Sequence, residues 1–242
     1  MPRYGKLNSA YLASWLERDE PGGPMWALNL MRYREWADYA DGRQTDLTGA
    51  EADEVYLPHE HLAAVGSRII LLAPVLHHLR GDDHRWDRIA IAQYRDRVAM
   101  IEMNASKAFQ VDEQHKDAAM DFTIVMAAFP IDDDPVPPQE SGAGSDRLLL
   151  LQVSGDASAP DLAEGIDATR VGRFWVEDRI IGDERTFTEA RFDLISVETA
   201  AELSSRGFAW DDRSYALIAD PTLDDVARSL SDTANVLFEE TR

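Results

Sequence analysis

The sequence predicts an α+β fold of two tandem ferredoxin-like modules, each with the element order βαββαβ. Three observations support this prediction. The expected strands and helices follow that order once before residue 130 and again after residue 147. Residues 131–146 are rich in acidic residues, proline and glycine, which is typical of a linker. One sheet face of each module needs a cover, and a second sheet of the same kind can provide it.

In the first half, strands are expected at residues 25–33, 68–79, 86–94 and 121–129. The first of them is apolar on both faces, as a central strand would be. Residues 50–65 fit a helix that Pro58 limits or kinks and that Gly66 caps. Residues 97–120 are rich in good helix formers and predict the second helix.

In the second half, strands are expected at residues 148–153, 173–181, 186–197 and 214–219. Short helices are expected at 160–169 and at 198–205, the latter with Thr199 as its cap. Residues 223–242 read as an amphipathic C-terminal helix. The predicted domains are therefore a first module at 1–130, a linker at 131–146 and a second, degenerate module at 147–242.

Composition excludes several classes of function. The chain of 242 residues has no cysteine, so disulfides, thiolate metal sites and cysteine nucleophiles are excluded. Its 24 Lys and Arg against 45 Asp and Glu give a net charge of −21, which argues against nucleic-acid and membrane partners. It carries no nucleotide-binding glycine motif and no apolar run long enough for a membrane span, so we expect a cytoplasmic protein without a cofactor.

The first half resembles a known family, the dimeric α/β-barrel proteins grouped as domain of unknown function 1330. The resemblance spans residues 25–130 and rests on the opening strand at 28–33, the segments 64–68 and 104–110, Trp86-Asp87 and Tyr94. Ser67, Arg95 and Phe109 depart from the family's pattern. The resemblance implies that the two modules form an α/β barrel of the dimeric α/β-barrel type. Whether the halves pack on each other or on a second chain stays open.

Asn29 is the first candidate site residue, because it interrupts an otherwise apolar strand. A buried amide needs hydrogen-bond partners, which either a ligand or the neighbouring backbone can supply. If Leu28 and Leu30 pack against the helices, alternation points Asn29 into the barrel. Tyr94 or its neighbour Gln93, at the end of the third strand, should line the same space.

Arg32 and two histidines complete the set of candidates. Arg32 could bind a carboxylate, or form a surface salt bridge in this acidic protein. His59 and His61 are two residues apart on a helix and cannot close on one metal ion, so no metal site is expected. One of them could face the cavity as an acid or base. Glu102 and Glu113 are expected on a solvated helix face.

These residues support a small-molecule-binding α/β-barrel protein with Asn29, Arg32, Tyr94, His59 and His61 as ligand-binding residues. By analogy of fold it would be a cofactor-independent oxygenase, isomerase or lyase acting on a hydrophobic or aromatic substrate. The alternative is a non-catalytic binding or assembly module, and whether the chain is an enzyme stays open. We expect a homo-oligomer, a dimer, because sheet edges and the C-terminal helix offer apolar surface.

Overall fold

The computed structural model describes residues 2–19, 22–56, 58–131, 146–156, 159–208 and 213–240. The first half holds β1 (Lys6–Leu7), α1 (Ser9–Leu16), β2 (Met25–Tyr33), α2 (Gly49–Tyr56), α3 (His59–Ala64), β3 (Arg68–Arg80), β4 (Arg88–Tyr94), α4 (Arg97–Ala105), α5 (Lys107–Ala119) and β5 (Met120–Pro130). The second half holds β6 (Arg147–Ser154), β7 (Ala168–Gly182), β8 (Glu189–Ser196), α6 (Val197–Ser205), β9 (Ser214–Ala219), β10 (Leu223–Asp224) and α7 (Val226–Glu240).

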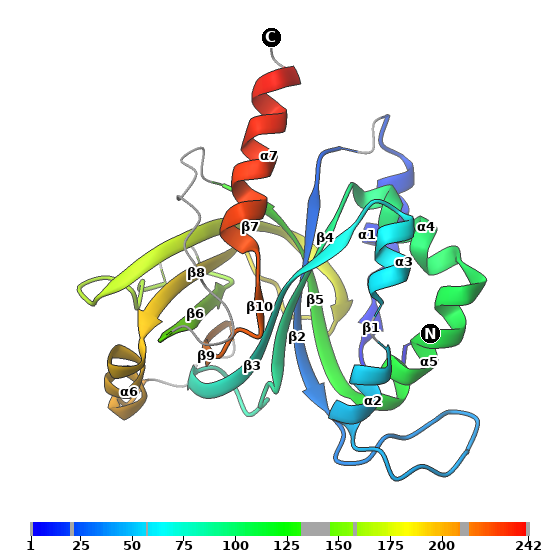
Figure 1. The fold of residues 1–242 in the computed structure, drawn as a ribbon, viewed down its shortest axis with the longest axis horizontal. Coiled ribbons are helices and arrows are strands. Elements are labelled where there is room, and N and C mark those ends of the chain that lie inside the picture. The colour runs from blue at the N-terminus through cyan, green and yellow to red at the C-terminus, as the bar shows by residue number, and fades with distance from the viewer. Residues whose placement is uncertain are drawn as a thin grey trace.

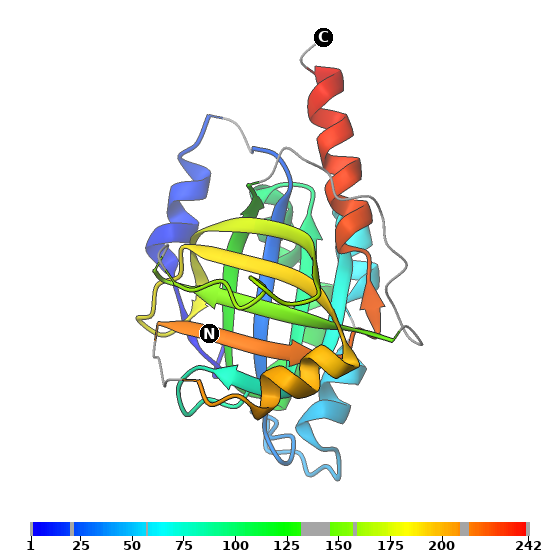
Figure 2. The ribbon, with the colours of Figure 1, turned by 90° about the vertical axis from the view of Figure 1, so that its left-hand side faces the viewer.

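Eight antiparallel strands close into one barrel. Their order is β7-β5-β2-β4-β3-β9-β6-β8, and β8 pairs again with β7. Each half contributes the strand order of a ferredoxin-like module, β5-β2-β4-β3 in the first and β9-β6-β8-β7 in the second. The strands of the second half run across those of the first in Figure 2, and the helices lie outside the barrel in Figure 1. The predicted fold class is confirmed.

The two halves pack on each other within one chain. Their sheets are joined by two antiparallel pairings, β3 with β9 and β5 with β7. The alternative in which each half packs separately is therefore wrong. The segment between them, residues 132–145, lies outside the described residues, and the domain boundaries stay a prediction.

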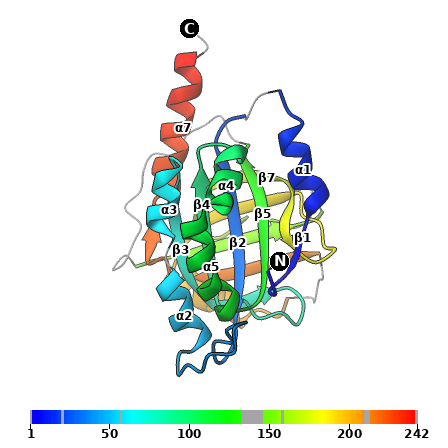
Figure 3. The same ribbon diagram turned by 90° about the vertical axis from the view of Figure 1, so that its right-hand side faces the viewer.

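The two faces of β2 are the reverse of the arrangement considered for Asn29, in which Leu28 and Leu30 pack against the helices. Leu28 and Leu30 are buried in the barrel interior, where their cluster joins residues of the first half such as Ile89 to residues of the second half such as Phe192. Ala27 and Met31 belong to a second core, between the sheet and the helices of the first half. Asn29 therefore lies on the outer face of the barrel, in the space between the sheet and the helices α2 to α5. In Figure 3, α4 and α5 lie in front of β4 and β2, and α2 and α3 lie at the side of β3.

Several local predictions need correction. The helix predicted at 160–169 is absent: residues 162–167 form turns and bends, and β7 begins at Ala168, because Gly165 takes a left-handed φ of 76° and the Asp161 side chain bonds to the sheet through Gln152. Ser196, not Thr199, caps α6 by accepting a hydrogen bond from the Thr199 backbone N–H at 3.0 Å.

The predicted helix at 97–120 is interrupted at Ser106, and that at 50–65 is two helices on either side of Pro58. The short elements β1, α1 and β10 were not predicted. Within the described segments, the search for a helix of sufficient length and apolarity to cross a membrane finds none.

Candidate functional site

A cavity lies between the outer face of the first half's sheet and the helices that cover it. Its volume is about 100 Å³, several times the ~10–15 Å³ that one ordered water needs. Strands β2 and β4 form its floor, and α2, α3, α4 and α5 contribute to its walls (Figure 3). Most of the lining is apolar, including Met31, Leu62, Ile69, Met103, Phe109 and Val125.

Helix α5 presents one face to this cavity. Phe109, Glu113 and Lys116 follow each other at intervals of four and three residues, which places them on the same side of a helix. Phe109 is buried and contributes to the core around the cavity. The expectation that Glu113 lies on a solvated face is wrong, because Glu113 lines the cavity. Burial raises the pKa of its carboxyl group, and the nearby Lys116 opposes that rise.

Lys116 brings an amine to the cavity wall. Its Nζ lies 5.5 Å from the centroid of the Tyr56 ring and 5.7 Å from that of Tyr4, within the range of cation–π attraction. Among the described residues, none forms a hydrogen bond or an ion pair with this Nζ. Burial lowers the pKa of Lys116, although the carboxylates of Asp53 and Glu113 raise it in part.

Asp53 stands on α2 at the same cavity and is held in a fixed position. Its Oδ2 accepts a hydrogen bond from the Tyr33 hydroxyl at 2.7 Å and forms an ion pair with Arg88 at 3.1 Å. Arg88 also pairs with Glu54. Burial raises the pKa of Asp53, opposed by the Tyr33 hydrogen bond and by the positive charges of Lys116 and Arg88.

Three tyrosines supply hydroxyl groups around the cavity: Tyr4, Tyr56 and Tyr94. All three are buried, and burial is the main cause that raises their pKa well above the ordinary value. They are therefore neutral hydrogen-bond donors at physiological pH. The Tyr94 hydroxyl reaches only the Met103 sulfur, at 3.9 Å.

Asn29 is 8% exposed and lines the cavity floor. Its Nδ2 donates to the carbonyl oxygen of Ala27 at 2.8 Å, so the backbone bonds the NH₂ group of the side-chain amide. Within the segments that the structure describes, nothing donates a hydrogen bond to its Oδ1. Asn29 and Tyr94 share this cavity, whereas Gln93 bonds to Arg68 and Thr233 elsewhere.

The other predicted site residues lie apart from the cavity. Arg32 forms an ion pair with Asp121 at 2.9 Å, with both side chains more than a third exposed, which is the surface salt bridge considered from the sequence. His59 is exposed on α3. His61 contacts Asp112 at 2.8 Å and packs against the ring of Phe109. A search of the described residues for clusters able to hold a metal finds none.

An apolar groove adjoins the cavity between α1 and α4. Its volume is about 470 Å³, and its lining includes Leu7, Leu12, Leu16, Ile101 and Ile180. Four residues line both spaces, namely Met100, Asn104, Glu113 and Ile181. The groove and the cavity are therefore neighbours that share a wall containing Glu113.

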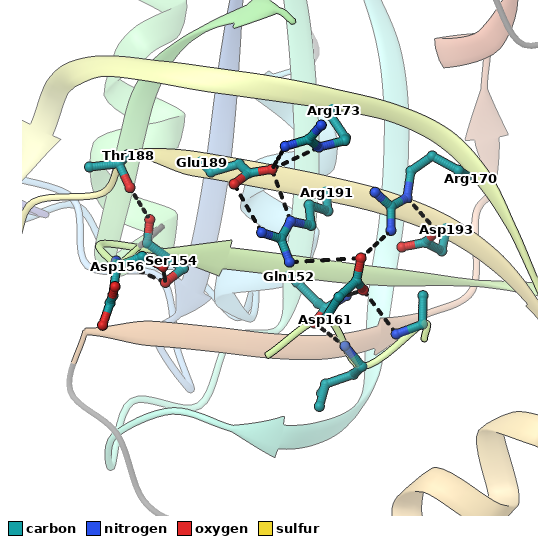
Figure 4. Close-up of polar contacts among 12 residues, drawn as sticks. Gln152, Ser154, Asp156, Asp161, Arg170, Arg173, Thr188, Glu189, Arg191 and Asp193 are labelled. Carbon is teal, nitrogen blue, oxygen red and sulfur yellow. Dashed lines mark hydrogen bonds and ion pairs between the residues drawn. The ribbon is translucent and has the colours of Figure 1, made fainter. Parts of the chain in front are cut away.

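The corresponding face of the second half is filled instead by charged side chains (Figure 4). Arg170 bridges Asp193 and Asp161, each at 2.6 Å, and Gln152 donates to Asp161 at 2.9 Å. Glu189 pairs with Arg191 at 2.9 Å and with Arg173 at 2.8 Å. The pKa of Asp161 falls to about 2, because its bonds to Gln152 and Arg170 outweigh its burial. Part of this face is therefore an ionic network, and another part packs Leu150 and Ile195 against Leu203 of α6, so we place the candidate site in the first half.

Lys116 is not among the site residues predicted from the sequence, although a signal was present. Lysine occurs three times in the chain, at positions 6, 107 and 116, among 24 basic residues. The basic residues of this chain are mostly arginines, so a lysine on the same helix face as the buried Phe109 is unusual. Of these two basic side chains, only the lysine amine can lose its proton in a protein.

The strand order and closure define the class of protein: a dimeric α/β-barrel type fold, formed here within one chain. No family model matches the chain, and no curated protein matches it. The resemblance to domain of unknown function 1330 therefore stays a prediction.

Three solved structures are similar in fold. A protein of unknown function from Rhodopseudomonas palustris is 26% identical over 53% of this chain and 98% of its own, with a TM-score of 0.47. A mutant chlorite dismutase from Candidatus Nitrospira defluvii is 14% identical over 91% of this chain and 98% of its own, with a TM-score of 0.40. A proposed monooxygenase from Lactobacillus acidophilus is 11% identical over 84% and 97%, with a TM-score of 0.37. No activity is transferred from them.

Proposed function

We propose that this chain binds a small, largely apolar or aromatic molecule in the cavity beneath α2 to α5 and moves a proton on it, as an isomerase or lyase does. One observation carries the proposal: an amine without a hydrogen-bond or ion-pair partner among the described residues, Lys116, lines an apolar cavity together with buried polar groups. Buried polar groups are normally bonded, so those left open in a cavity indicate a ligand.

Each polar group suits a step of proton transfer. Lys116, with its lowered pKa, is neutral in a larger fraction of molecules at pH 7 than a free lysine and can accept a proton. The hydroxyls of Tyr56 and Tyr94 can donate to an oxygen that becomes negative during the reaction. Glu113, whose pKa is raised, can return a proton to the product. These residues supply acid and base chemistry. Of the three reaction classes considered from the sequence, this chemistry favours an isomerase or a lyase over an oxygenase.

The test uses probes that share one ring and differ in their polar group: phenol, benzoate and acetophenone. We expect at least one of them to raise the melting temperature of the chain in proportion to ligand occupancy. Lys116→Met should abolish or strongly weaken this rise, and Lys107→Met, at the exposed start of the same helix, should leave it unchanged. Exchange of the acetophenone methyl protons in D₂O, followed by NMR, then reports proton transfer. No stabilising probe and no exchange would contradict the proposal.

The second candidate is the non-catalytic binding or assembly module. The apolar groove between α1 and α4 favours it, since Leu16 in that groove is 69% exposed. Such a surface could join two copies, in line with the expected homo-oligomer. Light scattering during gel filtration separates the two candidates. If the parent chain is a dimer and Leu16→Glu is a monomer, the assembly module is supported. If both are monomers, the assembly module is contradicted.

A further inference from the structure

We propose that Lys116 forms an imine with the carbonyl carbon of an aldehyde or ketone whose apolar tail lies in the groove between α1 and α4. This inference rests on the proposed function for the location of the site and adds the class of substrate. The observations that carry it are the amine at the cavity wall, which has no hydrogen-bond or ion-pair partner among the described residues, and the wall of four residues that this cavity shares with an apolar groove.

The position of Lys116 suits a nucleophile. A lysine that only stabilises structure pairs with a carboxylate, as Lys6 does with Glu184 at 2.7 Å. The Nζ of Lys116 instead lies beside the rings of Tyr56 and Tyr4. An amine placed among apolar and aromatic groups is the arrangement by which proteins activate lysine for attack on carbonyl carbons.

The reaction balances with groups that line the cavity. The neutral amine adds to the carbonyl carbon, and one proton passes from Nζ to the carbonyl oxygen, which gives a carbinolamine. Loss of that hydroxyl as water, with a proton from a neighbouring acid, then forms the C=N bond, and Nζ keeps its remaining proton as a protonated imine. Glu113 lies three residues before Lys116 on the same helix face and can protonate the departing hydroxyl. No oxidant, reductant or metal takes part.

The groove indicates the shape of the rest of the substrate. It is more than four times as large as the cavity, about 470 Å³ against about 100 Å³, and aliphatic side chains dominate its lining. Glu113 belongs to both walls, so a molecule whose carbonyl group reaches Lys116 can extend past Glu113 into the groove. An unbranched alkyl chain matches such a lining better than a charged or polar tail does.

Borohydride trapping tests this inference on the full chain. The protein is incubated with butanal, hexanal or octanal at pH 7 in the presence of sodium cyanoborohydride, and alkylated lysines are mapped by peptide mass spectrometry. With only three lysines in the sequence, Lys6 and Lys107 in the same digest act as exposed references. We expect Lys116 to be alkylated at least tenfold faster than either. Its yield at limiting aldehyde should rise about fourfold for each methylene that becomes buried.

Two variants separate the parts of the inference. Ala13→Phe adds a ring at an exposed position of α1 that lines the groove but not the cavity. It should remove the dependence on chain length while the reaction with butanal persists. Lys116→Arg should remove the preferential adduct without emptying the cavity wall.

The possible results have distinct meanings. Labelling of Lys116 no faster than that of Lys107 would overturn the imine, whereas binding of phenol or benzoate by the same protein would leave the proposed function standing. Failure of every aromatic probe together with failure of trapping would overturn both. Preferential labelling that is independent of chain length would overturn the assignment of the groove to the tail.

Discussion

The Nζ of Lys116 lies 5.5 Å from the centre of the Tyr56 ring, so the amine of α5 faces an aromatic side chain of α2 across the cavity. Asp53, on the same helix as Tyr56, pairs with Arg88 and Tyr33 instead. Asp53 is thereby engaged by Tyr33 and Arg88, and it acts on the Lys116 amine through its charge rather than through an ion pair.

The reactivity of Lys116 should rise at lower pH than that of a free lysine. Its pKa is lowered by burial, so its neutral, reactive form is populated below the ordinary value of 10.5. Asp53 and Glu113 face the amine and raise its pKa, Arg88 is the other charged group of the cavity, and the surrounding tyrosines are neutral. Competitive labelling with trace acetic anhydride at pH 6 to 11, normalised to the exposed Lys107, measures this profile. Glu113→Gln should move the profile to still lower pH, and a profile that coincides with that of Lys107 would contradict the assignment.

Replacing Asn29 by Leu should weaken binding without weakening the fold. The variant loses an acceptor that has no partner among the described residues, so we expect the free energy of unfolding to stay equal or increase. A ligand that donates to Oδ1 should lose about 1–1.5 kcal/mol, roughly a tenfold rise in Kd. Calorimetric titration with the best aromatic probe gives both Kd values. The matched control is Gln93→Leu, an amide of β4 that bonds outside the cavity, and equal losses in both variants would argue against a ligand at Asn29.

The ionic network on the second half should be a major source of stability. Asp193 is 1% exposed, and Arg170 pairs with it at 2.6 Å. Arg170→Met leaves that carboxylate buried without its partner, which should cost about 3 kcal/mol of unfolding free energy. Urea denaturation measures the loss. The matched control is Arg206→Met, whose exposed pair with Glu202 at 3.9 Å should contribute less than about 0.5 kcal/mol. Comparable losses for the two variants would show that the network is only loosely packed.

Asp161 should make the fold sensitive to acid between pH 4 and pH 2. Its pKa falls from 3.8 to about 2 in the folded chain, so its ionised form stabilises the fold above pH 3.8. That contribution is lost as the pH drops through the folded pKa near 2. Asp161→Asn should therefore be less stable than the parent chain at pH 6, with the difference shrinking toward pH 2. A difference that stays constant with pH would mean that hydrogen bonds to Gln152 and Ala163, rather than charge, hold this residue.

The barrel could be predicted because its signals are local and repeated. Eight apolar strands in the order of two ferredoxin-like modules are visible in the sequence, and β9 begins and ends at the predicted residues. The choice between packing within one chain and packing on a second chain could not be made from the sequence. That choice depends on pairings such as β3 with β9, which join residues more than a hundred positions apart.

The candidate site was harder to predict, because the pattern in β2 is ambiguous. Period-two alternation separates Asn29 from Leu28 and Leu30 but does not say which face the helices cover. The larger apolar residues turned out to fill the barrel, and this placed Asn29 under the helices. Glu113 was expected on a solvated helix face, and Lys116 was not among the predicted site residues. Their partial burial depends on how α5 meets α2 and the sheet, which no local pattern encodes.

The most direct test of the cavity as a binding site is to fill it. Ala90 lies directly opposite Asn29 in the β2–β4 pairing and lines the cavity. We would measure thermal unfolding of Ala90→Leu with and without saturating aromatic probe, beside Ala108→Leu on the exposed side of α5 as the control. We predict that Ala90→Leu melts about 2–4 °C higher than the parent chain and gains nothing from the probe, while the control still responds. An undiminished response of Ala90→Leu to the probe would contradict binding in this cavity.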